Sequence, residues 1–184
     1  MLASILSLFA LTGCTKIPEG LQPVQGFILE RFLGTWYEIA RLDHGFERGL
    51  DNVTAEFIAD GEDGFKLVNR GYRSKTGEWK EETGKGSFVG EKNVGSLKIS
   101  YFGPFYGGYH IVDIDRENYR YAMVAGPSRS ILWILSRDKT MDDKTYSALI
   151  AKAIHWGFDS KKLILVNQNP PAPAAAATPS PEKK

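Results

Sequence analysis

Gly34-Thr35-Trp36-Tyr37-Glu38-Ile39-Ala40-Arg41-Leu42 is the stretch on which the predicted fold depends. Successive side chains of a β-strand point to opposite faces, so counting in steps of two from Trp36 places Glu38 and Ala40 on its face. The stretch is rich in residues that favour strands. We expect it to form the first strand of an all-β domain, with Trp36 on the buried side.

A second stretch, Ile131-Leu132-Trp133-Ile134-Leu135-Ser136-Arg137, predicts a strand that ends in an arginine. In a closed antiparallel barrel the first and eighth strands are neighbours, so Arg137 can reach the indole of Trp36. A guanidinium over an indole face contributes ~0.5–2 kcal/mol, and its N–H groups can also bond to backbone carbonyls. We therefore expect Gly34, Trp36 and Arg137 to close one end of a barrel.

Short alternating runs separated by turn residues recur between these two stretches, at the spacing typical of sandwiches and barrels. Mostly tight connections favour an up-and-down arrangement, which leaves no sheet edge unpaired. The predicted fold is an eight-stranded antiparallel up-and-down β-barrel. Its strands are expected at residues 35–42, 53–59, 65–72, 79–89, 96–102, 109–115, 119–125 and 131–136.

One α-helix and a short final strand follow the eighth run. Asp142 and Asp143 place negative charge where a helix begins, and Gly157 is suited to its end. An apolar stripe at i, i+3, i+4 and i+7 predicts that the helix packs on the outside of the barrel. The stripe is Tyr146, Leu149, Ile150 and Ala153, and the last strand is expected at residues 162–166.

The start of the chain resembles a bacterial lipobox. Residues 1–13 are apolar and rich in small residues, and Leu11-Thr12-Gly13 precedes Cys14, the only cysteine. They are predicted to be a lipoprotein signal peptide, although they lack the usual Lys or Arg. Cys14 is then the site of lipidation; a buried cysteine in a cytosolic protein is the alternative. Thr15 stands where an Asp commonly signals inner-membrane retention, which favours the outer membrane.

Composition divides the rest of the chain. Residues 14–27 are predicted to be a lipidated linker, 28–169 the folded domain, and 170–184 a disordered Pro/Ala-rich tail. The net charge of +1 gives no reason to expect a nucleic-acid partner. The three histidines (His44, His110 and His155) are far apart in the sequence, with no neighbouring acid and no metal-ligand spacing. No catalytic residue, metal or cofactor is therefore predicted, and His110 is expected to point out of the barrel.

Three short motifs resemble those of lipocalins, in the same order and at similar spacing. They are Gly34-x-Trp36 with Tyr37-Glu38, the stretch Val112-Asp113-Ile114-Asp115, and Arg137. Longer stretches look like the bacterial outer-membrane lipocalins, which are lipoproteins, and their relatives apolipoprotein D and the plant temperature-induced lipocalins. These stretches are residues 34–41, 46–49, 102–109 and 132–137, and the resemblance extends from residue 14 to 166.

The resemblance implies that the barrel carries a lipid such as a fatty acid or lysophospholipid. An eight-stranded barrel is just wide enough to be filled by side chains or to hold one small ligand. Small residues expected inside, Gly84 and Gly86 among them, favour a cavity. Alternation predicts the ligand-binding residues Ala40, Val53, Ala55, Phe57, Leu67, Phe88, Ile99, Tyr101, Tyr109, Ile111, Ile131 and Trp133.

Some of this assignment leaves alternatives open. On the third strand either Phe65, Leu67 and Asn69 or the residues between them face inward, and we prefer the first register. Trp36, Leu135 and Phe57 are expected to be core, whereas Trp133, Tyr101, Tyr109 and Phe88 are expected to line the cavity. The candidates for head-group contacts are His44, Glu47, Arg48 and Arg70, with solvated loop charges as the simpler interpretation.

The predicted function is storage or transport of a lipid by a carrier anchored to the bacterial outer membrane through Cys14. It faces the periplasm or the surface, is a monomer or weak homodimer, and has a role in envelope maintenance under stress. A structural, partner-binding lipoprotein and a lipid-modifying enzyme are the alternatives. Because the only cysteine lies at the anchor, a cavity thiol cannot serve as a nucleophile, and no enzymatic activity is expected.

Overall fold

The computed structural model describes residues 14–169, so the predicted signal peptide (1–13) and tail (170–184) lie outside the described residues. Within this range no helix is both long and apolar enough to cross a membrane. The elements in chain order are α1 (Leu29–Phe32), β1 (Gly34–Leu42), β2 (Asp51–Asp60), β3 (Gly64–Arg73), β4 (Glu78–Phe88), β5 (Ser96–Phe102), β6 (Phe105–Ile114), β7 (Tyr121–Ala125), β8 (Leu132–Ser136), α2 (Asp143–His155), the 3-10 helix η1 (Ser160–Lys162) and β9 (Leu163–Leu165).

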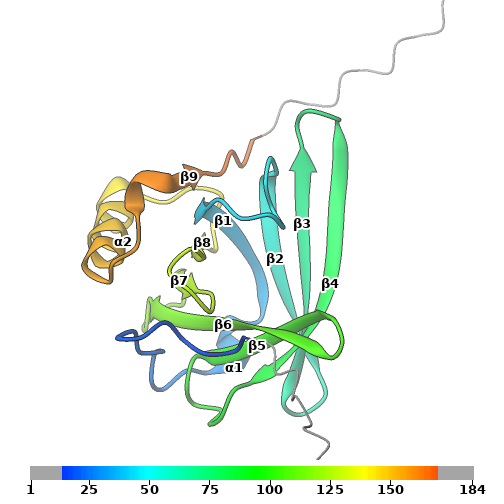
Figure 1. The fold of residues 1–184 in the computed structure, drawn as a ribbon, viewed down its shortest axis with the longest axis vertical. Helices are drawn as coiled ribbons and strands as arrows, with labels where there is room; N and C mark the ends of the chain where they lie inside the picture. The colour runs from blue at the N-terminus through cyan, green and yellow to red at the C-terminus, as the bar shows by residue number, and fades with distance from the viewer. Residues whose placement is uncertain (1–13, 170–184) are drawn as a thin grey trace, which may run out of the picture.

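Strands β1 to β8 form the predicted closed antiparallel barrel (Figure 1). Each strand pairs with the next along the chain, and β1 pairs with both β2 and β8. The first and last strands of the barrel are therefore neighbours, as expected for a closed antiparallel barrel. The additional strand β9 pairs antiparallel with the end of β1, from Ala40 to Leu42.

The residues of β3 that face inward include Phe65, Leu67 and Asn69, which is the preferred one of the two registers considered above. Phe65 and Leu67 are almost completely buried, whereas Lys66 between them is exposed. Because the pleat alternates without interruption from Gly64 to Arg73 opposite β4, the whole strand keeps this assignment. The features that were not predicted include the short helix α1, the 3-10 helix η1 and the start of β6 at Phe105 rather than at Tyr109.

A β-bulge in β1 overturns one predicted side-chain direction. The pairing with β8 shifts between Glu38 and Ala40, so that Glu38 lies opposite Leu135 but Ala40 lies opposite Ile134. One extra residue reverses the alternation beyond it. Ala40 consequently belongs to the cluster on the outside of the barrel, and its expected inward position is wrong.

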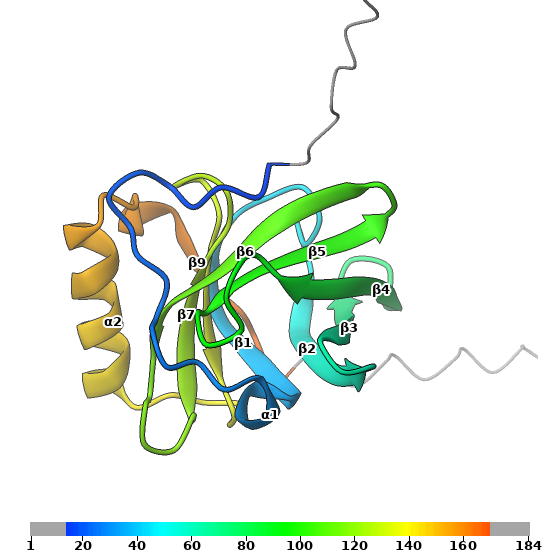
Figure 2. The same ribbon diagram turned by 90° about the horizontal axis from the view of Figure 1, so that it is seen from below.

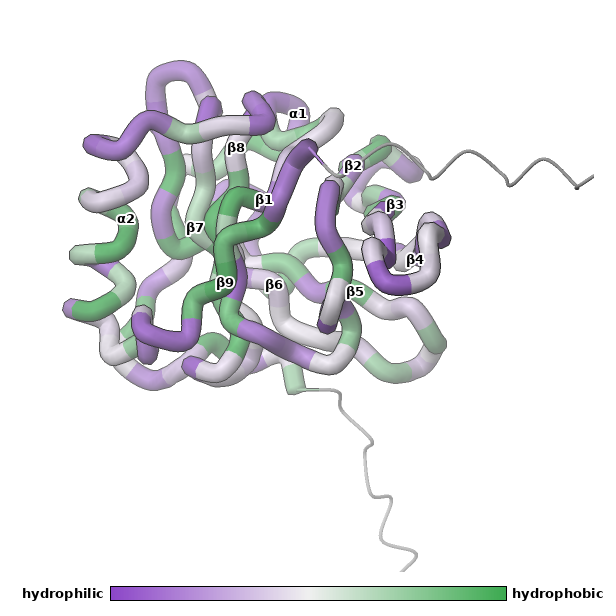
Figure 3. The backbone as a smooth tube through the Cα atoms, turned by 90° about the horizontal axis from the view of Figure 1, so that it is seen from above, coloured by the Kyte–Doolittle hydropathy of each residue, from purple (hydrophilic) through white to green (hydrophobic). Residues whose placement is uncertain are grey.

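Helix α2 covers this outer cluster, as predicted (Figure 1). Its N-cap is Asp142, whose side chain accepts a hydrogen bond from the Thr145 amide at 2.9 Å. The predicted stripe faces the barrel, and Leu149 and Ala153 are fully buried. Figure 3 shows hydrophobic residues, in green, on β1 and β9 where these paired strands run side by side.

Residues 14–27 lie along the barrel wall rather than as a free linker (Figure 2). The Gly108 amide donates a hydrogen bond to the Cys14 carbonyl at 3.0 Å, and the Val24 amide donates to the Ile111 carbonyl at 2.8 Å. The side chains of Leu21, Val24 and Phe27 are buried. His110 lies under the beginning of this segment, on the outer face of β6 as expected, with Nδ1 3.0 Å from the Ser96 hydroxyl.

Arg137 and Trp36 close the end of the barrel next to α1. The guanidinium carbon lies 3.9 Å from the centre of the indole ring. The guanidinium donates to the carbonyls of Thr35 and Leu33, both at 2.9 Å, and of Arg31 at 2.8 Å. Arg137 therefore ties α1 and the start of β1 to the end of β8.

Candidate ligand cavity

A cavity of about 480 Å³ occupies the other half of the barrel interior, within the range of about 300–1,000 Å³ typical of ligand sites. Most of its walls are aliphatic or aromatic. Its floor includes Leu135, which was expected to be core. The residues around it are Glu38, His44, Phe46, Glu47, Leu50, Val53, Ala55, Leu67, Asn69, Arg70, Gly71, Lys80, Glu82, Ile99, Tyr101, Phe102, Phe105, Tyr106, Gly107, Gly108, Tyr109, Pro127, Ile131, Trp133 and Leu135.

Most of the predicted ligand-binding residues meet in this lining. They come from β2, β3, β5, β6, β8 and the residue before β8: Val53, Ala55, Leu67, Ile99, Tyr101, Tyr109, Ile131 and Trp133. The other four are not in the lining. Ala40 lies outside the barrel, and Phe57 and Ile111 fill the closed end. Phe88 packs beside that core, with its ring 6.3 Å from that of Phe27.

The two inward glycines of β4 do not enlarge the cavity. A Cβ atom at Gly86 would lie 2.1 Å from Cζ of Phe65, and one at Gly84 would lie 2.8 Å from Cγ2 of Ile99. The space that each glycine leaves is thus occupied by a large side chain from a neighbouring strand. The prediction that these glycines leave free volume is wrong, because it did not account for the residues opposite them.

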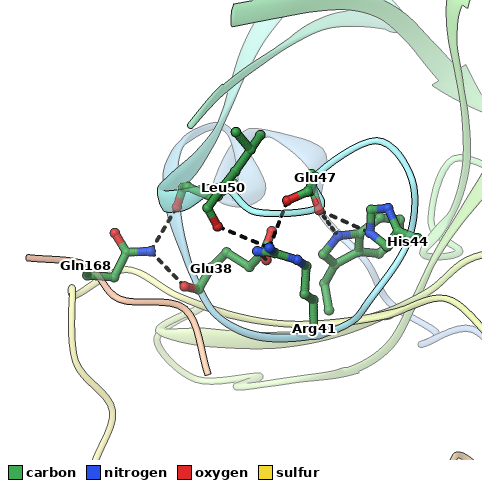
Figure 4. Close-up of polar contacts among 8 residues, drawn as sticks. Glu38, Arg41, His44, Glu47, Leu50 and Gln168 are labelled. Atoms are coloured by element: carbon green, nitrogen blue, oxygen red, sulfur yellow. Dashed lines mark hydrogen bonds and ion pairs between the residues drawn. The ribbon is translucent and has the colours of Figure 1, made fainter. Parts of the chain in front are cut away.

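Arg41 organises the polar part of the cavity wall (Figure 4). Its guanidinium, 2 % exposed, donates to Oε1 of Glu38 at 2.8 Å. It also donates to the carbonyl of Glu47 at 2.8 Å and to that of Leu50 at 3.0 Å. A buried charge is costly unless it is paired and hydrogen-bonded, and here these contacts fix the loop between β1 and β2.

Glu47 connects that loop to β8. The indole Nε1 of Trp133 donates to Oε2 of Glu47 at 2.9 Å, and Nε2 of His44 lies 3.1 Å from the same oxygen. Although burial acts to raise the pKa of Glu47, these two contacts and the charges of His44 and Arg41 lower it. His44 therefore has a neighbouring acid, contrary to expectation. That acid holds the loop against Trp133.

The second carboxyl group of the wall behaves differently. Burial raises the pKa of Glu38 well above its usual range, the negative charge of Glu47 raises it further, and Arg41 opposes the shift. Burial also raises the pKa values of Tyr101 and Tyr109, so both hydroxyls are neutral at physiological pH. The buried part of the wall is thus either neutral or acidic apart from His44 and Arg41, and the Arg41 guanidinium is already bonded to Glu38 and to the carbonyls of Glu47 and Leu50.

The remaining candidates for head-group contacts lie nearer the surface. Arg70 lines the cavity and donates to Oε2 of Glu81 at 2.6 Å. Arg48 pairs with Asp43 at 2.8 Å and is not part of the lining. Lys80 also lines the cavity but was not predicted. Basic side chains at the cavity therefore come from β3 and β4.

The sequence did contain a signal for the missed Arg41. Glu38 was expected inside an otherwise apolar barrel, and a buried carboxylate requires a partner. Arg41, three residues later, is excluded by strict alternation, since residues i and i+3 of a regular strand point to opposite faces. The bulge after Glu38 inserts one extra residue into the strand, so the alternation is reversed beyond it and Arg41 points inward.

Comparison with known proteins agrees with this architecture. Residues 27–168 match the family described as the lipocalin-like domain. The chain belongs to the lipocalin family. Among its relatives, this lipocalin is 48% identical to "Outer membrane lipoprotein Blc" of Vibrio cholerae, with 89% of this chain and 96% of the relative aligned. It is 44% identical to the protein of the same name from Escherichia coli K12, over 91% and 96% of the two chains.

More distant proteins also match this lipocalin. "Temperature-induced lipocalin-1" of Arabidopsis thaliana is 30% identical, over 89% of this chain and 91% of that protein. Insecticyanin from the tobacco hornworm Manduca sexta shares the fold with a TM-score of 0.65 at 20% identity, covering 83% of this chain and 86% of that one. The resemblance inferred from the short motifs is thus confirmed.

Proposed function

We propose that this lipocalin carries a single-chain lipid, a fatty acid or lysophospholipid, at the bacterial outer membrane, where acylated Cys14 anchors it. The observation that carries the proposal is the deep apolar cavity, which is open at one end and sealed at the other by Trp36 and Arg137. Burial of about ten methylenes at about 0.8 kcal/mol each gives about 8 kcal/mol, a micromolar affinity before ordering costs.

The charges of the wall favour entry of the lipid tail first. Glu38 and Glu47 flank the interior, so a carboxylate or phosphate bound beside them would be repelled when they are ionised. Exposed Arg70 and Lys80 offer positive charge at the opening, where Arg70 is paired with Glu81 and Glu82 also lines the cavity. The tail therefore lies against Leu67, Ile99 and Leu135, and the head group remains near the opening.

The outer-membrane location is supported by the names of the two bacterial relatives, both of them outer membrane lipoproteins. Two acyl chains or more on one cysteine anchor a protein stably, whereas a single chain does not. We expect the parent protein to fractionate with membranes and Cys14→Ser to be released. Binding without turnover, a role in envelope maintenance under stress, and a monomeric or weakly dimeric state remain predictions.

Ligand binding can be tested with the acyl-free Cys14→Ser protein. A fluorescent fatty acid should bind saturably, be displaced by lysophospholipid, and change the emission of Trp133. Ala55→Trp places an indole in the cavity and should weaken binding at least tenfold. The matched control is Ile58→Trp, whose side chain is 42% exposed on the same strand and should leave binding unchanged.

Two further results bear on the proposal. Mass spectrometry of lipid co-purifying with Cys14→Ser should identify a single-chain species. Absence of saturable binding to fatty acids, lysophospholipids and diacyl lipids alike would refute carriage, as would equal effects of Ala55→Trp and Ile58→Trp.

A further inference from the structure

Three exposed phenylalanines surround the opening of the cavity. Phe46 lies in the loop between β1 and β2, and Phe102 and Phe105 lie at the turn between β5 and β6. Their exposed fractions are 78%, 76% and 54%, yet all three also contribute to the cavity lining. Large apolar side chains that gather at one edge of a soluble domain mark an interaction surface. We call Phe46, Phe102 and Phe105 the aromatic rim.

The proposed anchor lies at the same end of the barrel. The Cys14 carbonyl accepts a hydrogen bond from Gly108, a residue of the cavity lining. From there the chain runs along the outside of the barrel to the closed end, where the Phe27 amide donates to the Asn93 carbonyl at 2.8 Å (Figure 2). An acyl group on Cys14 is therefore held beside the opening, because the contacts of residues 14–27 fix the path of the segment.

The opposite, closed end of the barrel carries charged turns. The turn between β2 and β3 carries exposed Asp60, Glu62 and Asp63, of which Asp60 pairs with Lys66 and Asp63 with Lys92. The turn between β6 and β7 is charged as well, with exposed Glu117 between Arg116 and Arg120. The two ends thus differ: exposed phenylalanines gather at the opening, whereas the opposite end carries charged turns.

We propose that the aromatic rim docks onto a phospholipid bilayer, so that the cavity opens directly toward the lipid. Phe46, Phe102 and Phe105 enter the boundary between head groups and acyl chains, where amphipathic surfaces bind membranes. A single-chain lipid then passes between bilayer and barrel with its tail shielded from water. This inference rests on the proposed acylation of Cys14 and the proposed lipid cargo.

Docking can be measured without the acyl anchor, as partitioning of Cys14→Ser onto vesicles of phosphatidylethanolamine and phosphatidylglycerol. Replacing the aromatic rim by serine (F46S/F102S/F105S) should lower the partition coefficient at least tenfold. The control I28S/I58S removes two exposed apolar side chains, 45% and 42% exposed, outside the rim and should bind vesicles as the parent does. Ala55→Trp should partition onto vesicles as the parent does, because this substitution blocks the cavity but leaves the rim intact.

Orientation is tested by a polarity-sensitive dye on a cysteine introduced in the Cys14→Ser background. The dye at Gly103→Cys, between two rim residues, should shift to the blue on vesicles, whereas the dye at Glu62→Cys should not. Docking is overturned if the serine variant partitions normally, if both dyes shift equally, or if Ala55→Trp abolishes partitioning. It is also overturned if the rim mediates self-association instead, seen in sedimentation as a dimer that the serine variant loses.

Failure of docking and failure of lipid carriage give different results. If the cavity binds no lipid but the protein still partitions onto vesicles through the rim, the proposal of lipid carriage is wrong and that of docking stands. If the fluorescent fatty acid binds saturably but the vesicle experiment fails, only the docking is wrong.

Discussion

The guanidinium of Arg137 lies 3.9 Å from the centre of the Trp36 ring, and this contact seals the barrel at the end opposite the cavity opening. The same guanidinium donates to backbone carbonyls of residues 31, 33 and 35. The pair therefore combines a cation–π contact with the satisfaction of carbonyl groups at the end of α1 and the start of β1.

Arg137→Ala should lower the free energy of unfolding by about 2–4 kcal/mol, because charge-assisted hydrogen bonds and the stacking contact are lost together. Arg137→Lys should recover little of this loss, since an ammonium cannot reproduce the planar fork of N–H groups. Urea unfolding followed by circular dichroism measures both variants. A lysine variant as stable as the parent would show that charge alone seals this end.

Gln168→Ala should destabilise the seam between β1 and β2. The Gln168 amide donates to the carbonyls of Glu38 at 2.7 Å and Val53 at 2.9 Å, where these strands have already separated. Loss of both bonds leaves two buried carbonyls unpaired, a cost of about 1–3 kcal/mol. Exposed Asn169→Ala is the control, and hydrogen exchange of residues 38–40 and 53–55 should rise in the Gln168 variant alone.

Gly86→Ala should cost about 1–3 kcal/mol, because its Cβ would lie 2.1 Å from the Phe65 ring in a well-packed interior. The double variant Gly86→Ala with Phe65→Leu should regain part of that loss by relieving the overlap. Gly107→Ala is the control: nothing lies within 4 Å of its added Cβ, so unfolding should change by no more than about 0.5 kcal/mol. Equal destabilisation by the two alanines would exclude overlap as the cause.

The free energy of unfolding should decrease as the pH is lowered, because of the protonation of His110. Burial lowers the pKa of this imidazole below its usual 6.5, while the carbonyls of Lys16 and Thr15 partly offset the effect. Below about pH 6.5 the unfolded chain takes up a proton that the folded protein does not yet bind. The contribution of His110 is thus complete above that pH and is lost as the pH falls through the folded-state pKa.

The slope from this one group is at most about 1.4 kcal/mol per pH unit. His110→Gln should flatten the dependence of the unfolding free energy on pH below about 6.5, whereas exposed His155→Gln should leave it unchanged. Denaturant unfolding at a series of pH values makes the comparison. The same slope in the parent and both variants would contradict the role of His110.

The spacing of apolar residues along the sequence was sufficient to predict much of this fold. Strand positions, the outward stripe of α2 and the inward register of β3 all follow from periodicity, because a side chain's face depends on its place in the strand or helix. Trp36 and Arg137 could be paired from the sequence because a closed barrel makes the first and eighth strands neighbours. Most of the predicted inward residues of β2, β5 and β8 also meet in the cavity, whereas Phe57 of β2 fills the closed end.

Only the tertiary structure decided what those inward residues enclose. The bulge after Glu38 turned Ala40 out and Arg41 in, and Phe65 filled the space left by Gly86. A bulge depends on the pairing with a distant strand, and the free volume at a glycine depends on side chains from other strands. The sequence by itself thus determined the barrel and its closed end, whereas packing among distant residues decided the cavity's extent, the buried network of Arg41 and the exposure of the aromatic rim.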